Sequence, residues 1–447
     1  MSLKRFDQLV GELRSTLAGL SDKRTRNNTQ YSMETIGLSA FAVFFTQCPS
    51  FLAYQKAMDK NKGQSNAQTL FQIETTPTDN HVRDMLDPVE PKALFPVYDS
   101  IYDAFEEQGI LNTFRSVNNT RLIALDGTWY FSSDKVHCEN CLHIEHKTGQ
   151  ITYYHSAITP VIVGPDKPYA IPLRPEFIVP QDGDTKQDCE IKAGKRWLDN
   201  NGAFYNTGNE TLLGDDLYAH QPFCRRALIN NYHFIFTCKP DSHKTLYRWV
   251  NLLEPGEDLH TLKVRVKNKN KWEYHIYRYA NAVPLAEGEG ALNVNWCEVT
   301  ITSKGKQLYH NTFISDFKIT DDNVAGIVIA GRARWKIENE NNNTLKTKGY
   351  HLKHNFGHGK KHLSSLLATM NILAFLFHSF LTFCDDAYRL IRDTLPTRKI
   401  FFEHIRALTH YMRFASWEAM MDFMMRGLEI GPYETTDRKS TRLNSSH

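Results

Sequence analysis

The chain carries, at residues 331–348, the sequence Gly-Arg-Ala-Arg-Trp-Lys-Ile-Glu-Asn-Glu-Asn-Asn-Asn-Thr-Leu-Lys-Thr-Lys. If this stretch is helical, Arg334 and Glu338 lie one turn apart on the same face, so the guanidinium can hold the carboxylate in place. The asparagine run at 339–343 is a poor helix former without an apolar stripe. It favours a turn that faces a polar cleft, and a solvated helix end is the alternative.

Two further acids follow short apolar runs that we predict to be buried strands. Residues 122–125 precede Asp126, and residues 211–214 precede Asp215. Carboxylates rarely stand at the edge of a core without a partner. Together with Glu338 they would form an oxygen-rich pocket of the kind that hard divalent cations prefer. Such a pocket indicates phosphoryl-transfer chemistry.

Three other groups of acids compete with this assignment. Asp216 is expected to point away from the pocket, because successive residues of a strand project to opposite sides. Glu340 has a lysine one turn earlier, whereas Glu338 has an arginine, and only arginine offers a planar fork for a carboxylate. The acids at 184–190 are expected to meet a helix dipole, with a catalytic role for Asp188 as the alternative.

The composition describes a chain of 447 residues with room for two or three domains. Lys and Arg number 53 against 50 acids, a formal charge of +3, so a surface for polyanions must come from local clustering. Eight irregularly spaced cysteines and no amino-terminal signal segment predict free thiols in a reducing cytoplasm. The longest apolar stretch, 366–383, is interrupted by polar residues and is interpreted as a buried helix, with a membrane span as the alternative.

The order of predicted elements indicates the fold class. Strands predominate from residue 120, and we expect three consecutive strands, a helix, a strand, a helix and a strand. The second and third strands are placed at 142–146 and 151–158. This is the order of the ribonuclease-H-like fold, in which the first and fourth strands are neighbours, so that their terminal acids meet.

We therefore predict an α/β protein with a ribonuclease-H-like catalytic core, an inserted β-rich subdomain, and helical regions at both ends. The N-terminal helical region is expected to bind DNA ends, although no helix-turn-helix pattern marks a reading helix. The tail has no apolar pattern and looks more like sequencing-adapter read-through than native protein. The predicted boundaries are 1–115 for the N-terminal region, 116–243 and 324–362 for the core, 244–323 for the insertion, 363–432 for the C-terminal helices and 433–447 for a disordered tail.

These residues together resemble the DDE-type insertion-sequence transposases of bacteria, in the cut-and-paste branch with a β-rich insertion before the catalytic glutamate. The likeness covers residues 120–360, and its most specific part is the run from Arg334 to Glu338 after the two strands that end on aspartate. It implies that Asp126, Asp215 and Glu338 are the catalytic, metal-binding triad and that Arg334 is their basic partner.

The chain departs from the family pattern at two positions. A tyrosine three residues before the arginine is replaced by Gly331, and a lysine seven residues after the glutamate is replaced by Leu345. Lys346 and Lys348 are the candidates to replace that lysine, although a shift of one residue turns a helical side chain by about 100°.

The resemblance implies metal-dependent DNA strand cleavage and strand transfer at the ends of an insertion sequence, with two Mg²⁺ or Mn²⁺ ions as cofactors. The alternative is a catalytically decayed or co-opted DNA-binding protein on the same fold. Expected partners are double-stranded DNA, as terminal inverted repeats and target, and a second subunit in a synaptic dimer, with no membrane. The expected location is the bacterial cytoplasm, at the nucleoid. Phosphate contacts that do not depend on sequence are expected from Arg332, Lys336, Lys348 and Lys353, with Lys346 in support.

Residues 137–143, His-Cys-Glu-Asn-Cys-Leu-His, contain ligand types that suit zinc. A structural zinc site needs four ligands, and there is no second Cys-x-x-Cys, so we interpret the segment as a hairpin with free thiols and keep zinc as the alternative. Four histidines recur at helical spacing further along, but two glycines interrupt them, which favours a basic loop beside DNA, with metal binding as the alternative. They are His351, His354, His358 and His362.

Overall fold

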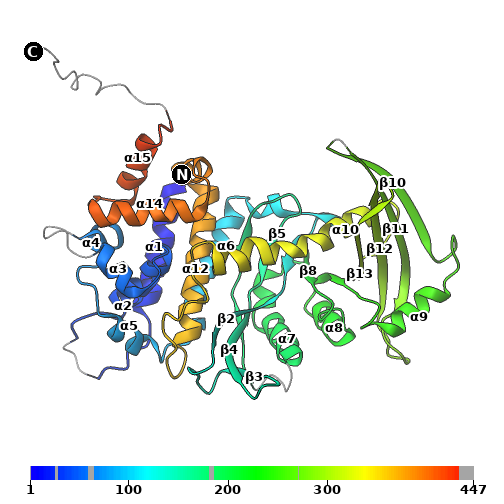
Figure 1. Ribbon diagram of the computed structural model, residues 1–447, viewed down its shortest axis with the longest axis horizontal. Coiled ribbons are helices and arrows are strands. Elements are labelled where there is room, and N and C mark those ends of the chain that lie inside the picture. The colour runs from blue at the N-terminus through cyan, green and yellow to red at the C-terminus, as the bar shows by residue number, and fades with distance from the viewer. Residues whose placement is uncertain (1, 26–28, 59–64, 181–185, 270, 432–447) are drawn as a thin grey trace, which may run out of the picture.

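The computed structural model describes residues 2–25, 29–58, 65–180, 186–269 and 271–431, with the side chains of 2–5 and 186–189 left out. The predicted tail at 433–447 therefore lies outside the described residues. Figure 1 shows three regions along the long axis: helices at one end, a central part of sheet and helices, and long strands at the other end.

Helices are concentrated in the first and last parts of the chain. They are α1 (Ser2–Ala18), α2 (Met33–Phe45), α3 (Phe51–Met58), α4 (Asn66–Phe71), α5 (Asp79–Leu86), α6 (Phe95–Glu107), α7 (Lys186–Tyr205), α8 (Gln221–Ile229), α9 (Lys244–Leu252), α10 (Val324–Arg332), α11 (Asn343–Thr347), α12 (Leu363–Cys384), α13 (Asp386–Thr394), α14 (Arg398–Tyr411) and α15 (Trp417–Gly427). Short helical turns are η1 (Pro91–Leu94), η2 (Leu111–Phe114), η3 (Val117–Asn119), η5 (Ala333–Trp335) and the π-helical η6 (Ile337–Asn342).

The strands form two sheets. They are β1 (Arg121–Ala124), β2 (Gly127–Ser133), β3 (Leu142–Glu145), β4 (Ile151–Ile158), β5 (Val161–Val163), β6 (Ala170–Pro172), β7 (Glu176–Ile178), β8 (Glu210–Gly214), β9 (His233–Thr237), β10 (His260–Asn268), β11 (Lys271–Pro284), β12 (Asn293–Ser303) and β13 (Lys306–Ser315). The large sheet has the order β10-β11-β12-β13-β9-β8-β1-β5-β6, and the small one has the order β2-β4-β3 with β7 beside β4.

The chain passes from the large sheet to the small one directly at Asp126, between β1 and β2. It returns between β4 and β5, where Pro160 has no backbone N–H for a continuous ladder. The strand predicted at 142–146 is β3, which pairs with β4 in the small sheet. The antiparallel neighbour of β1 is β5, and the strand predicted at 151–158 is β4 of the small sheet, so the second and third strands of the predicted order were both wrongly placed.

The predicted β-rich insertion is not a separate body. Its last strand, β13, pairs with β9 of the central part through Phe313 and Thr237, so one sheet runs through both regions. In Figure 1 the long strands β10 to β13 extend that sheet away from the helical end.

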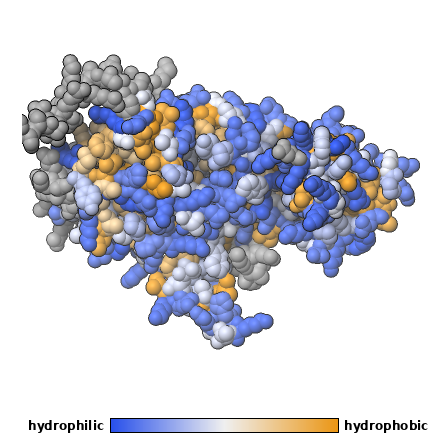
Figure 2. Space-filling view, turned by 45° about the horizontal axis from the view of Figure 1, so that its top comes forward, coloured by the Kyte–Doolittle hydropathy of each residue, from blue (hydrophilic) through white to orange (hydrophobic). Residues whose placement is uncertain are grey.

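The first and last helices share one core around α12 (Figure 1). Among the described residues, α12 is the one helix long and apolar enough to span a membrane by length and composition. Within the structure, 94% of its apolar stretch is buried, which is the environment of a core helix. In Figure 2 hydrophilic residues cover most of the central face, whereas apolar residues gather over the helical end.

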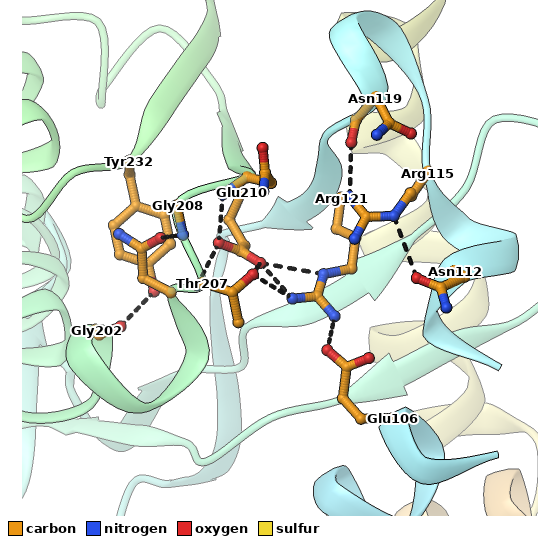
Figure 3. A network of polar contacts seen from close by, with 12 residues as sticks. Glu106, Asn112, Arg115, Asn119, Arg121, Gly202, Thr207, Gly208, Glu210 and Tyr232 are labelled. Carbon is orange, nitrogen blue, oxygen red and sulfur yellow. Dashed lines mark hydrogen bonds and ion pairs between the residues drawn. The ribbon is translucent and has the colours of Figure 1, made fainter. Parts of the chain in front are cut away.

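A buried ion-pair network holds the amino ends of β1 and β8 together (Figure 3). Arg121 and Glu210 face each other across the two strands, and each side chain is 1% exposed. The Arg121 guanidinium donates to Glu210, to Thr207 Oγ1 at 2.9 Å and to Glu106 of α6. The network therefore fixes the register of the two strands whose opposite ends carry Asp126 and Asp215.

Candidate functional site

Asp126 and Asp215 leave two adjacent parallel strands at the same edge of the sheet. In β1 and β8, Ala124 is opposite Leu213, and the Leu125 N–H donates to the Leu213 carbonyl at 2.9 Å. Each aspartate is the second residue after this opposed pair. The prediction that their strands are neighbours is confirmed.

The third acid lies on a segment that packs over this edge. Arg334 Nη2 is 3.2 Å from Glu338 Oε1, four residues later, and the Glu338 side chain is 53% exposed. In the same segment, Asn342 Nδ2 donates to Asp126 Oδ2 at 2.8 Å. Glu338 is thus held by Arg334 at the solvent side, while Asn342 anchors the segment on Asp126.

The asparagine run is neither a regular α-helix nor a solvated end. Asn341 and Asn342 are 0% and 5% exposed. Asn341 Nδ2 donates to Thr159 Oγ1 at 3.1 Å, and Thr159 Oγ1 donates to Asn342 Oδ1 at 3.1 Å. These polar contacts accompany the π-helical geometry of η6, a form that occurs frequently at functional sites.

The electrostatics of the site centre on Asp126. Burial raises the pKa of its carboxyl from the ordinary 3.8 to about 7, and the charge of Glu190 adds to the rise. The charges of Glu338 and Asp215 raise this pKa further, whereas Arg334 lowers it. Burial and the neighbouring negative charges therefore both disfavour the ionised form of Asp126, which a bound cation would stabilise.

Glu190 of α7 also belongs to this site, whereas the acids at 184–190 were expected to meet a helix dipole. It is 8% exposed, and its Oε1 accepts hydrogen bonds from the Gly127 N–H at 3.2 Å and the Tyr218 hydroxyl at 3.0 Å. A Cβ atom at Gly127 would lie 2.4 Å from the Glu190 carboxylate, so the glycine after Asp126 allows this close approach. That glycine was the available signal in the sequence. The side chain of Asp188, the predicted alternative on α7, lies outside the described residues.

The two competing acids point elsewhere. Burial alone would raise the pKa of Asp216, but hydrogen bonds from His243, Ser242 and the Lys239 N–H outweigh it and lower the pKa to about 2. Asp216 is therefore bound by the loop between β9 and α9, which agrees with the expectation that it points away from the pocket. Glu340 lines a pocket with Arg398 of α14, and Asp126 is not among the residues that line this pocket.

The predicted phosphate-binding residues have different surroundings. Arg332, Lys348 and Lys353 are exposed, and the Arg332 guanidinium lies 4.3 Å from the centre of the Tyr309 ring. Lys336 is 6% exposed, and its ammonium donates to the Lys167 carbonyl, which disfavours the predicted phosphate contact.

Both departures from the family pattern are packing positions. A Cβ atom at Gly331 would lie 2.7 Å from Phe313 and 3.0 Å from Ile235, so a tyrosine has no room there. Leu345 is 0% exposed and belongs to the core. Lys346 and Lys348 were the candidates to replace the lysine that the resembled pattern has at this position. Lys346 is partly buried, and Lys348 is exposed.

The raised pKa of Asp126 predicts a pH-dependent cost to stability. Because the folded pKa of about 7 exceeds the ordinary 3.8, ionising Asp126 destabilises the fold increasingly as pH rises between these values. Above pH 7 the full cost, at most ~4 kcal/mol, is present. Asp126→Asn removes it, so without divalent cations the variant should melt above the wild type at about pH 8, with a smaller difference at about pH 5.

Asp216→Asn provides a control of opposite sign. Its carboxyl has a lowered pKa, so its ionised form stabilises the fold above pH 4, and the variant should melt below the wild type at the higher pH. Thermal melting followed by circular dichroism measures both effects. A lower melting temperature for Asp126→Asn at about pH 8 would contradict the crowding of charge at this site.

No protein-family model matches the chain, and no curated protein sequence matches it. Among solved structures, the chain is similar to a cryo-EM structure of the piggyBac transposase in a synaptic complex with hairpin DNA. The TM-score is 0.41 with 10% sequence identity, over 97% of this chain and 83% of that one. With so low a TM-score and so few identical residues, this likeness assigns no role to any residue of the chain.

Proposed function

We propose that the protein is a DDE-type transposase that cleaves DNA strands and transfers them with the help of divalent cations. The observation that supports this proposal is the arrangement of the elements that carry the three acids. Asp126 and Asp215 end adjacent parallel strands, and the segment that carries Glu338 packs onto Asp126 through Asn342. Glu338 and Asp215 both act on the pKa of Asp126.

The strand order supports a ribonuclease-H-like core. Within the large sheet, β6, β5, β1, β8 and β9 lie side by side in that order. Numbered along the chain, these are the third, second, first, fourth and fifth strands of the core. β1 is parallel to β8 and antiparallel to β5, as the proposed fold requires. On this assignment β10 to β13 are an extension of the core sheet.

The donor atoms fit Mg²⁺ or Mn²⁺. Asp126, Asp215 and Glu338 offer carboxylate oxygens, the ligands that these hard cations prefer. Burial and the neighbouring acids raise the pKa of Asp126, and a bound cation would favour its ionised form. A pair of such ions, when bound, would activate the attacking oxygen and stabilise the leaving oxygen of the phosphodiester.

The surrounding residues would position these acids. Arg334 holds the exposed carboxylate of Glu338 through a contact of 3.2 Å, and Asn342 orients Asp126. Glu190 binds the Gly127 N–H, which fixes the backbone directly after Asp126. We propose that this support keeps the acids preorganised for metal binding.

DNA binding is expected to depend on exposed basic residues and to survive loss of the acids. Replacing Arg332, Lys348 and Lys353 together by alanine should weaken binding of any DNA sequence. The slope of log binding constant against log salt concentration should become shallower by about one for each phosphate that is no longer bound. Asp126→Ala should retain binding at low salt. Titration of labelled duplex at several salt concentrations measures both, and an Asp126→Ala protein that no longer binds would contradict the separation of roles.

The remaining parts of the proposal concern partners and location. The DNA would be the terminal inverted repeats of an insertion sequence and its target, held by a dimer in the bacterial cytoplasm at the nucleoid. Because the N-terminal helices share their core with α12, we propose that DNA-end binding belongs to the combined helical region.

The competing function is a DNA-binding protein that no longer cuts. Incubation of supercoiled plasmid with the full chain and Mn²⁺ separates the two, because an active enzyme produces nicked circles and Asp215→Asn does not. DNA binding by the wild type without nicking under any divalent cation would favour the decayed protein.

A further inference from the structure

Four potential metal ligands from three distant segments meet beside the small sheet. They are Cys138 and Cys141 of the β2–β3 connection, His155 of β4 and His358 of the loop before α12. Their ligand atoms all lie within 4.8 Å of one another. The flanking histidines of the sequence motif, His137 and His143, are exposed and do not belong to the group.

The spacing of the four atoms is that of a tetrahedron around one small ion. The two sulfurs are 3.9 Å apart, and His155 Nε2 lies 3.6 Å from Cys138 Sγ and 3.5 Å from Cys141 Sγ. His358 Nε2 lies 3.7 Å from Cys141 Sγ. Zinc bonds of about 2.3 Å to sulfur and 2.0–2.1 Å to nitrogen give tetrahedral edges of about 3.8 Å between sulfurs and about 3.6 Å between sulfur and nitrogen.

The two cysteines occupy a turn suited to holding a metal. The Cys141 N–H donates to the Cys138 carbonyl at 3.1 Å, which closes the turn. The Cys138 N–H lies 3.4 Å from Cys141 Sγ, so a backbone donor faces a sulfur that would carry negative charge. Both thiols are free cysteines.

The loop that supplies His358 is fixed by its own contacts. The Asp87 carboxylate accepts hydrogen bonds from the Lys360 and Lys361 N–H groups at 3.1 and 3.0 Å. Asn140, between the two cysteines, donates to the Lys361 carbonyl at 3.1 Å and joins this loop to the cysteine turn. The expected loop at 351–362 is present, and it brings His358 to the thiols.

The geometry points to a structural zinc site formed by Cys138, Cys141, His155 and His358, which clamps the small sheet to the loop leading into α12. Two cysteines and two histidines complete the four-coordinate shell of structural zinc and leave no position open for a substrate. The zinc would join segments up to 220 residues apart, from Cys138 to His358. This site is separate from the three acids and does not depend on the proposed function.

The test is the metal content of the full chain purified under reducing conditions without added metal. We expect about one zinc per chain by elemental analysis in the wild type. Cys138→Ser and His358→Ala should lose most of it. The matched controls are His137→Ala and His143→Ala, which change exposed histidines of the same segment and should retain it.

A second measurement applies to the wild type alone, because a variant that fails to fold would lose zinc indirectly. After removal of zinc by a chelator, Co²⁺ should bind once per chain and give the sulfur-to-metal absorption and intense visible bands of a tetrahedral site with two thiolates. Zinc removal should also lower the melting temperature by several degrees. A metal-free wild type that gives no thiolate-cobalt spectrum, or zinc lost equally in His143→Ala, would overturn the assignment.

Discussion

Glu338→Gln is expected to lower the rate of plasmid nicking by about a thousandfold or more, whereas Glu340→Gln keeps most of the activity. The amide keeps the size of the side chain and removes the negative charge that a divalent cation requires. Glu338 is braced by Arg334 beside Asp126, whereas Glu340 lines the pocket of Arg398. The two variants therefore differ in position by two residues and in expected activity by orders of magnitude.

The nicking rate in Mn²⁺ is the measurement, with DNA binding by both variants as the control for folding. We expect equal binding and unequal cleavage. If Glu340→Gln were inactive and Glu338→Gln still nicked plasmid, the assignment of the third acid would be wrong, and Arg334 would not be its partner.

Glu210→Ala is expected to destabilise the protein by about 3–5 kcal/mol, because it leaves the Arg121 guanidinium buried with only part of its partners. Glu210 also accepts the Thr207 N–H at 2.7 Å, so the substitution removes several hydrogen bonds at the start of β8 (Figure 3). The loss should reach the acids, since Asp126 and Asp215 depend on the register of the same two strands.

A surface ion pair gives the matched control. Asp199 pairs with Arg226 at 2.6 Å, with side chains 34% and 40% exposed, and Asp199→Ala should cost less than about 1 kcal/mol. Denaturant unfolding of the two variants, followed by circular dichroism, compares them. Equal, small losses for both would show that the buried network contributes little to holding the strands.

The sequence predicted the parts of the site that depend on local patterns. Asp126 and Asp215 each end a short apolar run, so their strand-end positions follow from residues next to them in the chain. The pairing of Arg334 with Glu338 depends on a spacing of four residues, which even the irregular helical segment preserves. Such signals need no knowledge of how distant segments pack.

The missed features depend on tertiary packing. Glu190 reaches Asp126 from α7 across 64 residues, and only the glycine at 127 hints at its approach. The sequence motif offers its flanking histidines as zinc ligands, but His155 and His358 lie 14 and 217 residues beyond Cys141. The second and third core strands were misplaced because the chain leaves the large sheet at Asp126 and returns to it only near Pro160. The pattern of hydrophobic residues predicts each of these strands, but it does not show which of the two sheets a strand joins.

Iron-directed backbone cleavage tests most directly whether the three acids hold divalent cations together. With Fe²⁺ in place of Mg²⁺, zinc retained in the protein, and ascorbate and peroxide added, hydroxyl radicals formed at the bound ion cut the nearby polypeptide. Our account predicts cuts clustered around Asp126, Asp215 and Glu338, which excess Mg²⁺ suppresses and Asp126→Asn eliminates. Cuts near only one of these residues, or cuts that persist unchanged in Asp126→Asn, would contradict a shared metal centre.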